Sequence, residues 1–308
     1  MEIRRQFSRI GWAFVVFCLV DVIIQVVMAV GIVLGNSHGY MWISDVNFLL
    51  LGQVSMYVFA FPVFWLMMKR IPSWKKDEGE KISLGSFFLW AVVCFGYTYI
   101  GNFLGQIFMG GMEAFTGMPQ ENPVMDTLNQ MNPWMVFLTT VIVAPAMEEV
   151  MFRKILIDRI VPFGQGVAVV VSGIAFGLFH GNFYQFFYAC GLGMIFAYLY
   201  SSTGRVRYGI FLHMMINMVG GVLPIALIQG MDGFGAETAV SLLGVMLLGI
   251  LMLGSVAGAI VLTCIFAGRL TWFKGWAPLP EKGFWRLVLT APGVVVFLVI
   301  CAILFFVS

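Results

Sequence analysis

Long apolar segments dominate the chain, and short polar segments separate them. A helix needs about 20 consecutive apolar residues to cross the hydrocarbon core of a bilayer. By this criterion we expect spanning helices near residues 11–34, 47–68, 84–109, 134–157, 165–181, 183–200, 207–229, 239–267 and 287–307. The pattern therefore predicts an all-α, polytopic transmembrane bundle of about eight or nine spans.

Composition agrees with this fold class. Of the 308 residues, 61% are hydrophobic and only 10% are charged, whereas about 25% of the residues in a soluble domain are charged. The net charge of +2 is too small to suggest a nucleic-acid partner. The 5 cysteines are scattered singly through apolar segments, so they indicate neither a metal-binding pair nor a disulfide framework.

The basic residues predict the orientation. All 17 Lys and Arg residues fall before the first span, after the second, at the end of the fourth, after the sixth or after the eighth, and none falls in 35–46, 110–133, 182–183 or 230–238. By the positive-inside rule the N-terminus is cytoplasmic, and nine spans would place the C-terminus outside. We expect an uncleaved signal-anchor helix at the start, a solvated cap at 110–133 and a multi-pass protein of the cell membrane. The short loops favour a prokaryotic plasma membrane.

Two adjacent carboxylates, Glu148 and Glu149, lie in the apolar segment 134–157. Ionisable residues inside a membrane are costly and usually functional. Residues four apart share a helix face, so we expect Glu149 to pair with Arg153. Glu148 is about 100° further round the helix and can face a cavity. Asp21, alone in the first span, is assigned no chemistry.

Two histidines in other spans can reach this acid. If the chain turns at 161–164, Glu148 lies about 21 Å before the turn and His180 about 24 Å after it. His213 lies only about 9 Å into its own span. The three side chains lie at the same depth if the turn projects into the cytosol by about 10 Å. Such a projection would place Arg153, Lys154, Asp158 and Arg159 in water. We therefore expect a site open to the cytoplasm.

The residue types favour hydrolysis by an activated water. A carboxylate in apolar surroundings binds protons more tightly than one in water, which suits a general base. An imidazole can relay a proton, and His213 with Asn217 on the same face can donate to an oxyanion. The chain has no HExxH or GxSxG motif. A zinc site formed by Glu and His stays open as an alternative.

Three motifs, Glu148-Glu149-xxx-Arg153, Phe176-xxx-His180 and His213-xxx-Asn217, resemble those of the CAAX protease and bacteriocin-processing family. These are intramembrane glutamic endopeptidases similar to the type II CAAX prenyl endopeptidase. The resemblance implies that Glu148 and His180 activate water and that His213 and Asn217 stabilise the oxyanion. It gives Glu149, Arg153 and Phe176 a structural or substrate-positioning role and implies no metal cofactor.

We accordingly divide the chain into a two-helix extension (1–83), a family-like catalytic core (84–230) and a second two-helix extension (231–308). The expected function is a metal-independent intramembrane endopeptidase that acts on hydrophobic or lipidated, CAAX-like peptides. The expected partners are this peptide and the bilayer. The alternative is a non-catalytic membrane protein, either a bacteriocin self-immunity or scaffold factor or a proton-coupled transporter; the sequence shows no internal repeat of the kind common in transporters.

Overall fold

The computed structural model describes residues 2–38, 48–74, 78–79, 81–117, 133–229, 236–280 and 282–307, and most of these residues are helical. Within these ranges there is no β-strand. Among the described residues, seven helices are long and apolar enough to span a membrane: Glu2–Gly35, Leu50–Lys69, Leu84–Thr116, Trp134–Phe163, Phe183–Thr203, Val206–Leu227 and Thr238–Arg269. Gln165–Phe179 and Pro292–Phe306 are shorter apolar helices. The expected all-α, polytopic membrane fold is confirmed, and most of the expected cap at 110–133 lies outside the described residues.

The chain forms two compact units, Met1–Ser73 with Pro278–Leu304, and Trp74–Ala277 with Phe305–Ser308. The division into a core and two extensions stays a prediction. The elements of the first unit are α1 (Glu2–Ser37), α2 (Phe48–Val54), η1 (Ser55–Ala60), α3 (Phe61–Lys69), α14 (Phe284–Leu289) and most of α15 (Pro292–Val307).

In the first unit, the α1 helix contacts η1, α3 and α14. It also meets α15 where Gly11 and Gly293 let the two backbones touch, because a Cβ at either glycine would overlap the other helix. Asp21 of α1 accepts hydrogen bonds from Ser55 of η1 and from Gln25. The lone carboxylate of the first span is thus satisfied partly by a neighbouring helix.

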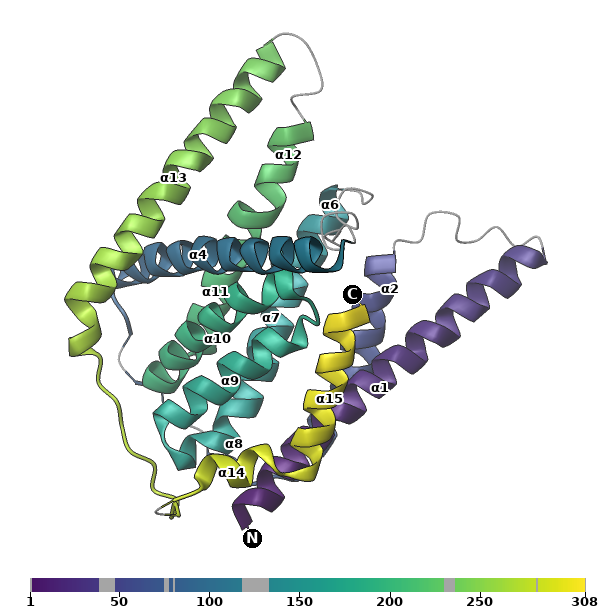
Figure 1. The fold of residues 1–308 in the computed structure, drawn as a ribbon, viewed down its shortest axis with the longest axis vertical. Coiled ribbons are helices and arrows are strands. Elements are labelled where there is room, and N and C mark those ends of the chain that lie inside the picture. Colours follow the sequence, from purple (N-terminus) through teal and green to yellow (C-terminus); the bar gives the residue numbers. More distant parts are fainter. Residues whose placement is uncertain are drawn as a thin grey trace. The chain divides into compact units, whose positions relative to one another are not determined.

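The second unit contains the three motifs. Its elements are α4 (Leu84–Thr116), α6 (Pro133–Val136), η2 (Phe137–Val143), α7 (Ala144–Glu149), η3 (Val150–Ile157), α8 (Asp158–Ile160), η4 (Val161–Phe163), α9 (Gln165–Phe179), α10 (Phe183–Thr203), α11 (Val206–Asn217), η5 (Met218–Val222), α12 (Leu223–Gln229), α13 (Ala236–Phe266) and η6 (Ala267–Arg269). Helix α10 packs against α9, α4 and α11, and α11 packs against α7 (Figure 1).

Small residues bring α9 and α10 close together. Gly173 and Gly177 are four residues apart on α9, and a Cβ at Gly177 would lie only 3.0 Å from the carbonyl oxygen of Phe186 on α10. Pairs of small residues at this spacing allow helix backbones to approach closely in membranes. The approach fixes the end of α9, where His180 follows.

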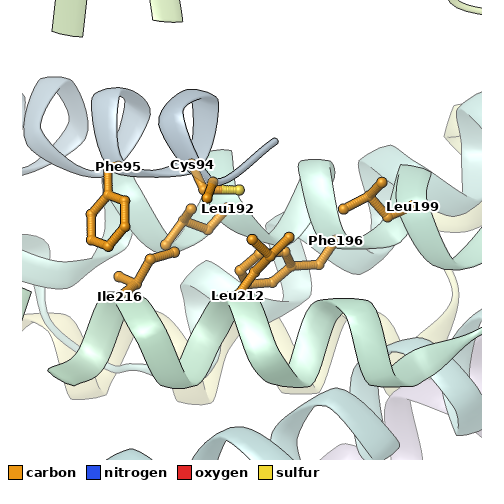
Figure 2. Close-up of a cluster of buried hydrophobic side chains, with 8 residues drawn as sticks. Cys94, Phe95, Leu192, Phe196, Leu199, Leu212 and Ile216 are labelled. Carbon is orange, nitrogen blue, oxygen red and sulfur yellow. The ribbon is translucent and has the colours of Figure 1, made fainter. Parts of the chain in front are cut away.

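A hydrophobic cluster sets the rotation of α11. Figure 2 shows its side chains, which come from α4, α10 and α11: Ala91, Cys94, Phe95, Leu192, Phe196, Leu199, Leu212 and Ile216. Leu212 and Ile216 share one face of α11 because they are four residues apart. His213 and Asn217 follow them by one residue each, about 100° further round. Burial of the leucine and isoleucine therefore directs the histidine and asparagine toward α7.

The turn between the helices at 158–164 is buried, contrary to our expectation. Of the four residues expected in water, Lys154 is exposed, whereas Arg153 is fully buried and Asp158 and Arg159 are each only 8% exposed. The Tyr200 hydroxyl donates to Asp158 at 2.7 Å, and Arg159 donates to the carbonyl oxygen of Ile155 at 2.6 Å. The backbone N–H of Ala277 donates to the carbonyl oxygen of Pro162 at 3.0 Å. Asp158 thus has a partner on a distant helix, whereas Arg159 bonds a carbonyl one turn earlier in its own helix.

Candidate active site

The helix that carries the two glutamates is irregular on both sides of them. The α7 turn lies between two π-helical segments, η2 and η3, and π-helical segments are rare and often found at functional sites. At the end of η2, the backbone N–H of Ala144 bonds the carbonyl of Thr139, five residues earlier. The next residue, Pro145, has no N–H, so the carbonyl of Thr140 has no corresponding backbone donor.

Asn217 supplies the missing donor. Its Nδ2 donates to the Thr140 carbonyl oxygen at 2.8 Å, which ties the end of α11 to the helix of the glutamates. An amide nitrogen carries two hydrogens, so one N–H of Asn217 is used in this bond and the second can serve another acceptor. The carbonyl freed by Pro145 thereby orients Asn217.

Glu149 and Arg153 form the expected ion pair. The two side chains are 0% exposed, and Arg153 Nε lies 3.0 Å from Glu149 Oε2. Arg153 Nη2 donates to Glu149 Oε1 at 3.0 Å and Nη1 donates to Ser172 Oγ at 2.9 Å. The guanidinium also lies 4.7 Å from the centre of the Phe176 ring. A two-point bond of this kind satisfies both charges in a buried setting.

His213 lies between the two glutamates. Its Nε2 is 3.8 Å from Glu148 Oε2, and its Nδ1 is 3.4 Å from Glu149 Oε1. The Nδ1 atom is buried and makes no hydrogen bond, so its contact with Glu149 is close without having bonding geometry. The side chain of Glu148 keeps 13% of its surface exposed, whereas that of Glu149 is fully buried.

His180 directly follows the last residue of α9 and lies near Glu148 and His213. Its Nδ1 lies 2.8 Å from the carbonyl oxygen of Phe176, and since a carbonyl only accepts, Nδ1 carries the proton and Nε2 is left as an acceptor. Electrostatic interactions link His180 with Glu148, His213 and Arg153. The residues from the three motifs are therefore gathered in one region.

Phe176 is the common packing partner of this region. Its ring centre lies 4.9 Å from that of His180 and 5.7 Å from that of His213, in both cases edge to face. It also carries the Arg153 guanidinium on its face. A buried aromatic ring in contact with three site residues restricts the rotation of each.

Sequence reasoning missed three residues that build the site. Ser172 accepts from Arg153 and donates to the carbonyl oxygen of Phe152 at 2.9 Å. Gly209 leaves room for the Glu149 carboxylate, because a Cβ there would lie 2.5 Å from Oε2. Thr140 contributes only its carbonyl. Gly209 precedes His213 by one helical turn, which is the one sequence signal that pointed to it.

Within the described ranges, no group of three or more His, Cys, Asp or Glu side chains is arranged to hold a metal ion. The expected roles of Glu148, His180, His213, Asn217, Glu149, Arg153 and Phe176 remain predictions.

A helical bundle that holds two glutamates, two histidines and an arginine within apolar helices is a candidate functional site, because ionisable residues inside a membrane are usually functional. Residues 130–219 match the family model described as type II CAAX prenyl endopeptidase Rce1-like, and all three motifs fall inside that range. The Bacillus subtilis (strain 168) protein named "Putative membrane peptidase YdiL" is 30% identical over 173 residues, which cover 54% of this chain and 68% of that protein.

The chain belongs to the Rce1-like family, and the resemblance drawn from its motifs is confirmed. It is thus a multi-pass membrane protein of a peptidase family. No solved structure matches the chain.

Proposed function

We propose that the protein is a metal-independent intramembrane endopeptidase of the cell membrane that cleaves hydrophobic or lipidated, CAAX-like peptides. The single observation that carries this proposal is the convergence on His213 of two carboxylates, 3.8 and 3.4 Å away, in a membrane helix bundle. Membership of the Rce1-like family supports the substrate class.

Glu148 and His180 are the proposed water-activating pair. Glu148 is the more exposed of the two glutamates, so it can meet a water, and the Nε2 of His180 is an acceptor. The carboxylate takes a proton from the water as the oxygen attacks the peptide carbonyl, while His180 accepts a hydrogen bond from the same water. The proton on Glu148 then passes to the departing amine.

His213 and Asn217 are the proposed donors to the oxyanion. The attack places negative charge on the carbonyl oxygen, and fixed N–H donors stabilise that charge more in the transition state than in the substrate. The second N–H of Asn217 and an N–H of His213 provide such donors. Arg153, through Glu149, holds His213 in place.

The proposed topology follows the basic residues. We place the N-terminus in the cytoplasm and the peptide entry on the cytoplasmic side, in a prokaryotic plasma membrane. The bacterial source of the relative supports this setting.

The test measures cleavage of fluorogenic peptides, with and without a prenyl group, by the full-length protein in lipid nanodiscs. We expect Glu148→Gln and His180→Ala to lower kcat at least about 10²-fold, the scale of general acid–base catalysis, with unchanged thermal unfolding. Glu113→Gln on α4 is the matched control, because Glu113 is exposed and outside the site. Full activity in Glu148→Gln would overturn the mechanism, and retention of a cellular phenotype by Glu148→Ala would favour a scaffold.

The metal-free part has its own test. We expect full cleavage after prolonged treatment with a strong zinc chelator. Loss of cleavage that added zinc restores would overturn this part and leave the peptidase assignment intact.

A further inference from the structure

The connection between α9 and α10 contains a hydrogen-bonded group that the proposed mechanism does not use. Asn182, which is buried, begins α10, and its Oδ1 accepts from the backbone N–H of Gln185 at 3.0 Å. This is an ordinary helix cap. The Nδ2 of Asn182 also donates to the carbonyl oxygen of His180 at 2.9 Å and to Gln185 Oε1 at 2.8 Å. These two bonds exceed what capping requires.

The chain of bonds continues to Tyr188. Gln185 Nε2 donates to the Tyr188 hydroxyl at 2.9 Å. The tyrosine is held firmly: its ring packs on the hydrophobic cluster of Figure 2, and its backbone touches α4 at Gly101, where a Cβ would lie 2.5 Å from Tyr188 Cα. Tyr188 also interacts electrostatically with Glu148. The bonds therefore run from the backbone of His180 to a fixed hydroxyl in the electrostatic range of Glu148.

We propose that Asn182, Gln185 and Tyr188 act as a positioning chain that fixes His180 relative to Glu148. The ring of His180 is already held by its bond to the Phe176 carbonyl, and Asn182 holds its backbone. With both ends fixed, Nε2 points in one direction. This role rests on the proposed function, because it matters only if His180 shares a water with Glu148.

The geometry explains why such a chain is needed. His180 follows the last residue of α9, and helix ends fray more easily than helix centres. A displacement of about 1 Å in a catalytic group can cost about 10²-fold in rate. A chain of amide and hydroxyl bonds anchored on α10 counteracts that movement without touching the substrate.

The experiment is a double-mutant cycle on cleavage by the full-length protein in nanodiscs. Tyr188→Phe keeps the ring and removes the hydroxyl, and we expect kcat to fall about 3- to 10-fold, the range for one neutral hydrogen bond, with KM unchanged. Gln185→Leu removes both links, and we expect a fall of about 10- to 100-fold. Because the two residues act in series, the double variant should equal Gln185→Leu alone. Tyr198→Phe on the same helix is the control, since its hydroxyl faces Thr271.

Asn182→Ser separates capping from positioning. Serine keeps a good helix cap but lacks the amide that reaches His180, so we expect normal thermal unfolding and a kcat reduced as in Gln185→Leu. The positioning chain would be overturned if Tyr188→Phe and Asn182→Ser kept the wild-type kcat, or if the effects of Tyr188→Phe and Gln185→Leu multiplied in the double variant. If Glu148→Gln still lost activity in the same assay, the proposed function would stand without the positioning chain. A wild-type protein that cleaves none of the peptides would instead overturn the proposed function and this role with it.

Discussion

Replacing Arg153 by methionine tests the energetics of the site most directly. The substitution keeps an unbranched side chain and leaves the Glu149 carboxylate buried without its two 3.0 Å bonds. It also removes the bond to Ser172 and the contact with the Phe176 ring. Removing one partner of a fully buried ion pair costs about 3–5 kcal/mol, because the remaining charge has no compensation. That is a large share of a net stability of about 5–15 kcal/mol.

The assay is reversible unfolding in mixed micelles with increasing denaturing detergent, followed by circular dichroism. Arg153→Met should lower the free energy of unfolding by about 3–5 kcal/mol. The double variant Glu149→Gln/Arg153→Met should lose less, since no uncompensated charge is left. Lys154→Met is the matched control, because the neighbouring lysine is exposed and its change should lie within about 0.5 kcal/mol. The pair would not hold the helix if Arg153→Met were as stable as Lys154→Met, or if the double variant were less stable than Arg153→Met alone.

Two further predictions concern other contacts. Gly209→Ala places a Cβ 2.5 Å from Glu149 Oε2, so the carboxylate must move, and we expect about 1–3 kcal/mol of destabilisation and a drop in kcat. Gly191→Ala is the control in unfolding and cleavage assays, because a Cβ at Gly191 has open space around it. Equal behaviour of the two variants would contradict the reasoning. Ser55→Ala removes a donor to Asp21 in the first unit, and detergent unfolding should detect a loss of about 1–3 kcal/mol without any change in kcat, a result that a fall in kcat would refute.

Much of the fold follows from the sequence because hydropathy alone marks helices that cross a membrane. Each expected segment overlaps one of the seven long helices or the two shorter apolar ones, although the bounds differ: the helix expected at 134–157 continues to Phe163, and the one expected at 287–307 begins at Pro292. The Glu149–Arg153 pair was also predictable, because a spacing of four residues determines a shared helix face without any knowledge of the fold.

Contacts between distant segments were not predictable in the same way. Asp158 and Arg159 were expected in water because a charged residue near a turn usually is. The structure buries both, and Asp158 accepts hydrogen bonds from the Tyr200 hydroxyl and the backbone N–H of Trp74. The π-helical segments around α7 were missed as well, because the apolar pattern of a π-helix over a few residues does not differ from that of an α-helix. Pro145 was the visible signal, but its consequence for Thr140 depends on that π-helical spacing.

The same carboxylate oxygen connects stability with catalysis in this site. Glu149 Oε1 lies 3.0 Å from Arg153 Nη2 and 3.4 Å from His213 Nδ1. An arginine that holds this oxygen therefore also sets the position of the imidazole, whose opposite nitrogen faces Glu148. Because the protein interior is densely packed, the imidazole cannot adjust independently when the carboxylate moves. Arg153, which touches neither water nor peptide in the proposed mechanism, should for this reason influence kcat as well as folding.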